Sequence, residues 1–162
     1  MLTRCEAGYG FPLVEGYGLS EGTCGSTDNP VAGPRRAGTV GLPFPGQEIR
    51  IVDADGTEAA PGTDGEAVVS GPNMMRGCLG RPDETARVIV DGWWHGGDVG
   101  RLDAEGYLTL VGRSKDMIIR GGENIYPTEI EDVRAGDPSS LLMRSHLSAE
   151  VTWWNAYRMP CA

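Results

Sequence analysis

Glycine and proline are distributed along this chain in a way that limits the length of any helix or strand. The 162 residues include 25 Gly and 11 Pro, which fall between short apolar runs and not in one low-complexity block. Glycine weakens regular elements through its conformational freedom, and proline removes a backbone donor. The pattern therefore predicts many short strands joined by turns, as in a β-rich domain.

Four stretches have the residue pattern of strands, namely residues 49–51, 66–70, 99–102 and 107–111. Ile49 and Ile51 alternate with polar residues, as expected of a half-buried strand. Asp55-Gly56 and Glu105-Gly106 are typical of the turns that reverse a hairpin. Two hairpin regions are therefore expected in the middle of the chain.

The last fifty residues divide into two parts. Residues 117–119 predict a short buried strand, and Tyr126-Pro127 predicts a helix with proline at its first position. Ile130 and Val133 would lie on the inner face of that helix. From about Arg134 the sequence follows neither the helical nor the strand period, so an irregular tail is expected over residues 134–162, and a shifted reading frame is one hypothesis for it.

The charge balance excludes one class of partner. The formal net charge is −9, and no basic stripe is present, so nucleic acid is not an expected partner. No apolar run is long enough to span a bilayer, so stable membrane insertion is not expected either. The four cysteines are scattered, without a Cys-x-x-Cys pair. This pattern favours a reducing compartment and a cytoplasmic location.

Three segments carry a specific series of motifs. The first is Gly-Tyr-Gly-Leu-Ser-Glu at residues 16–21. The second, residues 65–86, contains Gly-Pro-Asn and Arg-Pro-Asp-Glu-Thr. The third contains Gly-Trp-Trp-His-Gly-Gly-Asp at residues 92–98, Gly-Arg-Ser-Lys-Asp at 112–116 and Arg-Gly-Gly-Glu-Asn at 120–124. Together they resemble the adenylate-forming superfamily of acyl-CoA synthetases, luciferases and peptide-synthetase adenylation domains, over roughly residues 16–133.

The resemblance implies a mainly β fold in four parts. Residues 1–37 would be a remnant of the large N-terminal domain, and residues 38–112 a distorted antiparallel β-barrel or sandwich. Residues 113–133 would hold the hinge and the opening strand and helix of the C-terminal α+β domain. Residues 134–162 are the irregular tail.

The first motif is expected to contact the nucleotide and its metal. By resemblance, the ring of Tyr17 lies against the adenine of ATP or AMP, with Gly18 beside it. Ser20 offers its hydroxyl to the α-phosphate. Glu21 holds the Mg²⁺ that bridges phosphate oxygens, a role that suits a carboxylate.

The third motif is expected to contact the ribose and to contain the hinge. Asp98 resembles the residue that accepts hydrogen bonds from both ribose hydroxyls, because an ionised carboxylate is an acceptor only. Arg113 would add a cationic fork near the ribose and phosphate. Lys115 falls at the hinge position. Gly121 and Gly122 resemble the loop that lines the pantetheine tunnel for coenzyme A.

Some residues of these motifs have simpler interpretations. His95 is interpreted as a structural imidazole and not as a catalytic base. Trp93 and Trp94 are interpreted as packing residues and not as a stacking platform. Taken alone, Tyr17 would be a core aromatic and Arg113 a surface charge, and only the joint order of the motifs favours a site.

The implied activity joins a carboxylate, such as a fatty acid, to coenzyme A at the expense of ATP, through an acyl-adenylate. The family uses a further lysine near its C-terminus, whereas Lys115 is the only lysine here. We therefore expect a fragment that is inactive as an isolated chain. Two alternatives stay open: a non-catalytic β-domain remnant that binds AMP or a partner, and a fragment of a peptide-synthetase adenylation domain.

Overall fold

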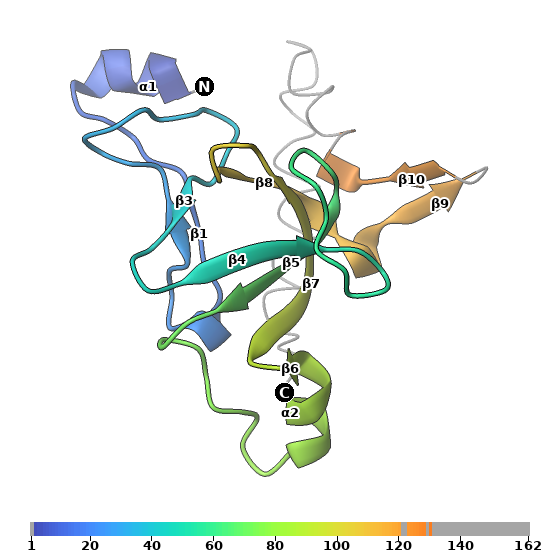
Figure 1. Cartoon of the computed structure of the whole chain (residues 1–162). Helices are drawn as coiled ribbons and strands as arrows, with labels where there is room; N and C mark the ends of the chain where they lie inside the picture. Colours follow the sequence, from blue (N-terminus) through green and yellow to red (C-terminus); the bar gives the residue numbers. More distant parts are fainter. Residues whose placement is uncertain (1, 121–122, 129, 131–162) are drawn as a thin grey trace.

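The computed structural model describes residues 2–120, 123–128 and 130, and strands predominate among them (Figure 1). The helical elements are α1 (Leu2–Tyr9), α2 (Pro82–Val88) and the 3-10 helices η1 (Ser20–Gly22) and η2 (Ser114–Asp116). The strands are β1 (Gly16–Tyr17), β2 (Thr27–Asp28), β3 (Leu42–Pro43), β4 (Glu48–Val52), β5 (Gly65–Ser70), β6 (Ile89–Val90), β7 (Trp93–Leu102), β8 (Leu108–Arg113), β9 (Ile118–Arg120) and β10 (Glu123–Ile125). No helix in this described part is long and apolar enough to cross a membrane.

A curled antiparallel sheet forms the centre of the molecule (Figure 1). Its strand order is β4-β5-β7-β6, and β8 also pairs with β7. One edge of β7 pairs with β5, while β6 and then β8 follow its other edge. The main core cluster consists of Ile49, Ile51, Ala67, Val69 and Leu108. The long strand β7 thus connects all the other parts of the sheet.

An irregularity in β7 lies directly before Asp98. Val68 pairs with His95 and Glu66 pairs with Val99, so the single residue Ala67 on β5 faces residues 96–98 on β7. Such a β-bulge bends the strand and changes the direction in which the next side chain points. Gly97 has φ +77, a conformation that residues with a side chain rarely adopt.

The smaller sheet β1-β2-β3 leads the chain into η1. After Tyr17 the chain folds back on itself, and the Ser26 amide donates to the Tyr17 carbonyl at 2.8 Å. A Cβ on Gly18 would lie 1.6 Å from the carbonyl oxygen of Cys24. No side chain fits at this close approach, so the tight return requires glycine at position 18.

The prediction of a mainly β fold is confirmed. Three of the predicted strands lie within β4, β5 and β7, and the fourth, residues 107–111, matches β8 except for Tyr107, which precedes it. Two predictions of burial are wrong, since Ile118 is 52% exposed and Ile130 is 45% exposed. The sequence pattern predicted the strand at Ile118 and the helix at Ile130, but it did not predict which side chains pack against them. Residues 127, 128 and 130 are helical as expected, whereas Val133 and the tail 134–162 lie outside the described residues. The four-part division of the chain stays a prediction.

Helix α2 was not predicted, although local signals for it were present. It begins at Pro82, with Asp83 and Glu84 in its first turn and Arg87 in its last. Proline at the start and acidic residues near the N-terminus both favour a helix. The helix packs beside β6 and β7, where its buried residue Val88 joins Trp94 in a second apolar cluster.

Candidate functional site

Three of the predicted site residues meet at the carboxylate of Asp98. The Tyr17 hydroxyl donates to Asp98 Oδ2 at 2.6 Å, across 81 positions of sequence. Arg113 Nε donates to Asp98 Oδ1 at 2.8 Å. Asp98 and Arg113 face each other across the β7–β8 ladder, and Tyr17 is contributed by β1. We call these three residues the site cluster.

The site cluster is buried at its centre and reaches solvent on one side. The side chain of Asp98 is 12% exposed, whereas that of Arg113 is 41% exposed. A buried carboxylate needs compensating donors, and Tyr17 and Arg113 supply one for each oxygen. The arrangement keeps an ionised carboxylate close to the surface without leaving it unpaired.

Tyr17 is held as a neutral hydrogen-bond donor. Burial raises the pKa of its phenol far above the ordinary value, and the negative charge of Asp98 and the hydrogen bond to Asp98 raise it further. The charge of Arg113 lowers this pKa and the charge of Glu21 raises it, by smaller amounts.

Asp98 keeps part of its capacity to accept hydrogen bonds. A carboxylate offers about four acceptor directions, two on each oxygen. Tyr17 and Arg113 occupy one direction on each oxygen. Among the residues that the structure describes, no other side chain is seen to donate to Asp98, so one direction on each oxygen is left.

The η1 turn, which carries Ser20 and Glu21, is fixed by the segment around Asn73. The Met75 amide donates to the Glu21 carbonyl at 2.7 Å. The Thr23 hydroxyl donates to the Asn73 carbonyl at 2.7 Å, and the Asn73 side-chain amide donates to the Gly22 carbonyl. Ser20 is exposed and Glu21 half-buried. The Gly-Pro-Asn motif of the second segment thus supports the first motif, a role that sequence reasoning did not assign.

Glu66 was seen only as a strand residue in the sequence, yet it contacts the bulge next to Asp98. Its Oε1 accepts from the Gly97 amide at 2.9 Å, and its Oε2 lies 3.0 Å from His95 Nδ1. This contact supports the structural interpretation of His95. No local sequence signal reports it, because Glu66 and His95 are 29 positions apart.

The remaining predicted residues are placed as follows. Lys115 lies in η2 and is exposed. Gly121 and Gly122 lie outside the described residues. Trp94 is 3% exposed in the core, as expected of a packing residue, and the Trp93 ring lies under the Arg50 guanidinium at 4.3 Å. Among the residues that the structure describes, no group of three or more His, Cys, Asp or Glu could hold a metal ion.

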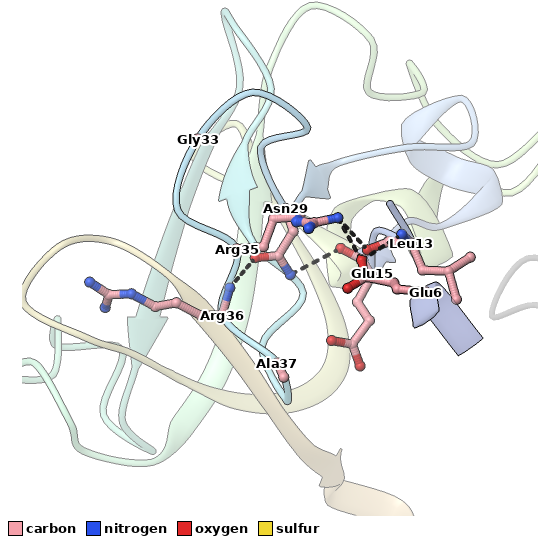
Figure 2. A pocket seen from close by; sticks show the side chains of 8 residues that line it. All are labelled: Glu6, Leu13, Glu15, Asn29, Gly33, Arg35, Arg36 and Ala37. Atoms are coloured by element: carbon pink, nitrogen blue, oxygen red, sulfur yellow. Dashed lines mark hydrogen bonds and ion pairs between the residues drawn. The ribbon is translucent and has the colours of Figure 1, made fainter. Parts of the chain in front are cut away.

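A cavity of about 320 Å³ is lined by residues outside the site cluster (Figure 2). Arg35, in its lining, pairs with Glu6 at 2.7 Å. Its lining residues are Glu6, Leu13, Glu15, Asn29, Gly33, Arg35, Arg36 and Ala37. None of these residues was predicted to bind the nucleotide.

Comparison with known proteins gives a consistent result. The family model described as AMP-binding enzyme matches residues 1–79. A long-chain-fatty-acid–CoA ligase of Salmonella typhimurium is 48% identical over 121 residues, which are 75% of this chain and 22% of the ligase. The ATP-bound MatB of Rhodopseudomonas palustris is 37% identical with a TM-score of 0.80, over 85% of this chain and 27% of MatB.

A further solved structure, the O-succinylbenzoate coenzyme A synthetase of Bacillus subtilis in complex with ATP and magnesium ion, is 35% identical with a TM-score of 0.74. The match covers 85% of this chain and 29% of the synthetase. In sequence and fold the chain is similar to AMP-forming acyl-CoA ligases of the adenylate-forming superfamily, and it spans 22% of the length of the Salmonella relative.

Proposed function

We propose that this chain is the ribose-binding and hinge portion of an ATP-dependent acyl-CoA synthetase. In the parent reaction a carboxylate attacks the α-phosphate of ATP, which forms an acyl-adenylate and releases pyrophosphate, and the thiol of coenzyme A then takes the acyl group and releases AMP. The observation that carries the proposal is the convergence of Tyr17 and Arg113 on the buried Asp98 carboxylate. These residues are distant in sequence, and together they hold one carboxylate in place. Such a carboxylate can accept hydrogen bonds from the two hydroxyls of a ribose.

In this proposal Asp98 accepts hydrogen bonds from both ribose hydroxyls. Its spare acceptor direction on each oxygen supports this role, as does its low exposure, since a desolvated carboxylate makes strong charge-assisted hydrogen bonds. Arg113 orients the Asp98 carboxylate through its Nε donor. The exposed remainder of its guanidinium adds positive charge on the side where phosphates would approach.

The first motif would bind the rest of the nucleotide. The Tyr17 ring lies against adenine while its hydroxyl stays on Asp98, and Gly18 leaves room beside it. Ser20 is exposed and free to offer its hydroxyl to the α-phosphate. Glu21 would hold Mg²⁺ with a single carboxylate, and substrate phosphates and water would complete the ion's shell, as this ion commonly requires. The ion supplies charge neutralisation at the phosphates.

Lys115, Gly121 and Gly122 would serve the second half of the reaction. Lys115 lies in the short η2 turn between β8 and the β9–β10 hairpin, where a backbone rotation would move everything that follows. The two glycines would line the path of the pantetheine arm, because they present no side chain to a thin ligand.

The substrate and location belong to the same proposal. The Salmonella relative is a long-chain-fatty-acid–CoA ligase, so a fatty acid is the first carboxylate to test. A cytoplasmic location fits a reaction that consumes ATP and coenzyme A. The 162-residue chain alone should bind AMP weakly and not turn over, because its single lysine already occupies the hinge position.

Isothermal titration calorimetry, with AMP titrated into the full chain, tests the proposed ribose contact. We expect Asp98→Asn to weaken AMP binding at least about tenfold, because the ribose loses a charged acceptor. The matched control is Asp64→Asn, which removes the same charge from an exposed pair with Arg101 at 2.8 Å on the same sheet. Equal affinities in both variants would contradict the proposed ribose contact.

An assay for carboxylate-dependent pyrophosphate release tests the second part of the proposal. We expect the isolated chain to give no release above a blank that lacks the fatty acid. Measurable release would show that the chain completes adenylation by itself, which would refute the proposed inactivity and also exclude a non-catalytic remnant.

A further inference from the structure

Glu66 joins two strands at the point where the central sheet is irregular. Its Oε1 accepts from the Gly97 amide at 2.9 Å, and its Oε2 lies 3.0 Å from His95 Nδ1. Both partners belong to β7, whereas Glu66 belongs to β5. The carboxylate is 30% exposed and His95 27% exposed. Both carboxylate oxygens of Glu66 therefore contact residues of the neighbouring strand β7.

The bulge at residues 96–98 creates the need for such an acceptor. On the β5 side these residues face only Ala67, so the β5–β7 ladder does not pair all of their backbone groups, while Asp98 pairs with Arg113 of β8 on the other side. The Glu66 side chain supplies the acceptor for Gly97 in place of a backbone carbonyl. Gly97 has φ +77, a conformation that glycine adopts readily and other residues rarely do.

The backbone of the bulge is also packed at Gly96. A Cβ on Gly96 would lie 2.7 Å from Nε1 of Trp94, and Trp94 itself is 3% exposed in the core. The backbone at Gly96 is therefore confined by a buried indole, and the backbone at Gly97 is held by a carboxylate. Asp98 is the next residue, and its direction follows from the shape of this bulge.

We propose that Glu66 is a positioning residue for Asp98. Through Gly97 it fixes the bulge, which in turn aims the Asp98 carboxylate at Tyr17, Arg113 and the ribose hydroxyls. His95 holds the second oxygen of Glu66, so that the first stays on Gly97. The inference rests on the proposed function, because the ribose contact belongs to that proposal. The contact between Glu66 and Gly97 does not depend on it.

Three variants of the full chain separate positioning from general support of the fold. Glu66→Ala removes both contacts. Glu66→Gln keeps a carbonyl oxygen that can still accept from Gly97. Glu48→Ala is the matched control, because Glu48 is a carboxylate on the same sheet, its side chain is 70% exposed and it lies 3.6 Å from Arg50, away from the bulge.

Amide hydrogen exchange tests the first step without any ligand. In Glu66→Ala we expect the Gly97 amide to exchange about tenfold faster or more, while amides of the β4–β5 ladder keep their protection. In Glu66→Gln and Glu48→Ala the Gly97 amide should stay protected. An unchanged Gly97 exchange rate in Glu66→Ala would overturn the inference.

Paired titrations with AMP and 2′,3′-dideoxy-AMP test the second step. We expect Glu66→Ala to weaken AMP binding about tenfold and to leave the dideoxy analogue within about twofold of the wild type. Glu66→Gln should recover most of the preference for AMP. A merely structural role would weaken both ligands equally, and that result would also overturn the inference.

The Asp98→Asn variant distinguishes a failure of this inference from a failure of the proposed function. If Asp98→Asn keeps the full preference for AMP over the dideoxy analogue, the ribose contact is wrong. Glu66 is then judged in the ligand-free chain by the ¹³C chemical shift of the Asp98 carboxylate. A shift that moves in Glu66→Ala supports positioning, and one that stays unchanged overturns it.

Discussion

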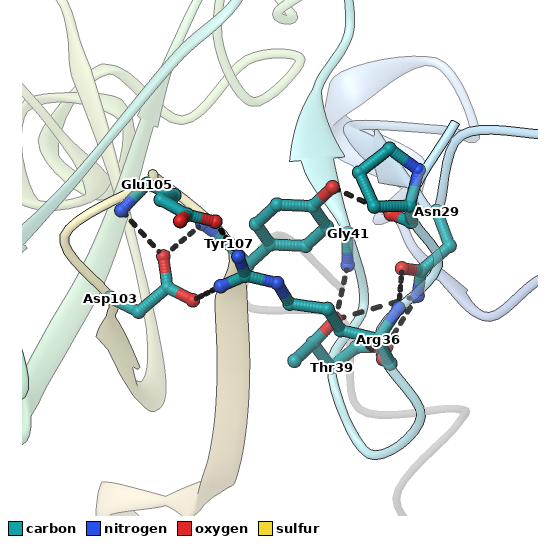
Figure 3. Close-up of polar contacts among 8 residues, drawn as sticks. Asn29, Arg36, Thr39, Gly41, Asp103, Glu105 and Tyr107 are labelled. Carbon is teal, nitrogen blue, oxygen red and sulfur yellow. Dashed lines mark hydrogen bonds and ion pairs between the residues drawn. The ribbon is translucent and has the colours of Figure 1, made fainter.

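Two clusters in this molecule use the same residue types for different ends. The site cluster joins Tyr17, Asp98 and Arg113. The second, which we call the turn cluster, joins Arg36, Asp103, Glu105 and Tyr107 at the β7–β8 turn (Figure 3). Each connects a segment near the start of the chain with the β7–β8 hairpin, across 81 positions for Tyr17–Asp98 and 67 for Arg36–Asp103.

The turn cluster uses its polar groups internally. Asp103 Oδ1 accepts from the Glu105 amide at 2.8 Å and the Tyr107 amide at 3.0 Å, while Oδ2 pairs with Arg36. The Tyr107 hydroxyl donates to the Pro34 carbonyl at 2.6 Å, and the Arg36 guanidinium lies 4.2 Å from the Tyr107 ring centroid. Such a network stabilises the fold.

The site cluster differs in the burial of its carboxylate. The Asp98 side chain is 12% exposed, whereas those of Asp103 and Glu105 are 39% and 65% exposed. Residue composition alone does not separate a structural cluster from a binding cluster. The burial of the carboxylate separates these two, and this difference can be tested by mutation.

The largest effect is expected at Asn29, which connects the turn cluster to its surroundings. This side chain is 3% exposed, accepts from the Arg36 amide at 3.0 Å and donates to the Thr39 carbonyl at 2.8 Å. Asn29→Ala leaves both groups without these partners, so we expect a loss of about 3 kcal/mol in the free energy of unfolding, measured by urea denaturation. AMP affinity of the folded protein should not change. Asn29→Asp, which keeps the acceptor, should lose about half as much, and a weakened AMP affinity would contradict the separation of the two clusters.

Alkaline pH should act through the site cluster. The pKa of Tyr17 is raised in the folded chain above the ordinary 10.0, so the protonated phenol favours the folded state. This contribution is complete below pH 10 and is lost as the pH rises above it, because the unfolded chain then releases a proton that the folded chain retains. We expect Tyr17→Phe to make the fall in unfolding free energy above pH 10 shallower, by about 1.4 kcal/mol per pH unit. Urea titrations from pH 9 to 11 measure this, and equal slopes would show that Tyr17 is not held neutral.

Parts of both clusters could be predicted from the sequence and parts could not. Local patterns predicted the strands around Ile49 and Ile51 and around the Glu105-Gly106 turn. Tyr17, Asp98 and Arg113 were named as site residues only because of the resemblance to a family. Their contact is non-local, and no period in the sequence encodes it.

The features that escaped prediction share a physical cause. The bulge at residues 96–98 depends on how β5 and β7 align, and the role of Glu66 follows from that alignment. The exposure of Ile118 depends on what packs against the β9–β10 hairpin, which an apolar residue type does not report. Helix α2 is the exception, because its Pro82 start and acidic first turn were readable locally.

Removing one hydroxyl from the turn cluster tests whether this cluster contributes to AMP binding, with a smaller loss of stability than Asn29→Ala. Tyr107 is 4% exposed and its hydroxyl donates to the Pro34 carbonyl at 2.6 Å. We expect Tyr107→Phe to lose about 1 kcal/mol in unfolding free energy, since one hydrogen bond is removed and the ring keeps its packing. Calorimetric AMP titration of the same variant should give the wild-type affinity. A variant that binds AMP less tightly would show that the turn cluster contributes to the site.

The smallest effects on stability are expected from replacing each arginine by lysine, which keeps the charge and removes the planar fork. Arg36→Lys should cost about 0.5–1 kcal/mol, because the guanidinium contacts two carboxylates and the Tyr107 ring. Arg113→Lys should stay within about 0.5 kcal/mol of the wild type, because the Arg113 side chain is 41% exposed and solvent screens its pair with Asp98. Paired urea denaturation measures both. The losses of AMP affinity should rank the two variants in the opposite order, since Arg113 contacts the buried Asp98 carboxylate that is proposed to bind the ribose, and Arg36 does not. If Arg36→Lys weakened AMP binding as much as Arg113→Lys, the burial of the carboxylate would no longer distinguish a binding cluster from a structural one.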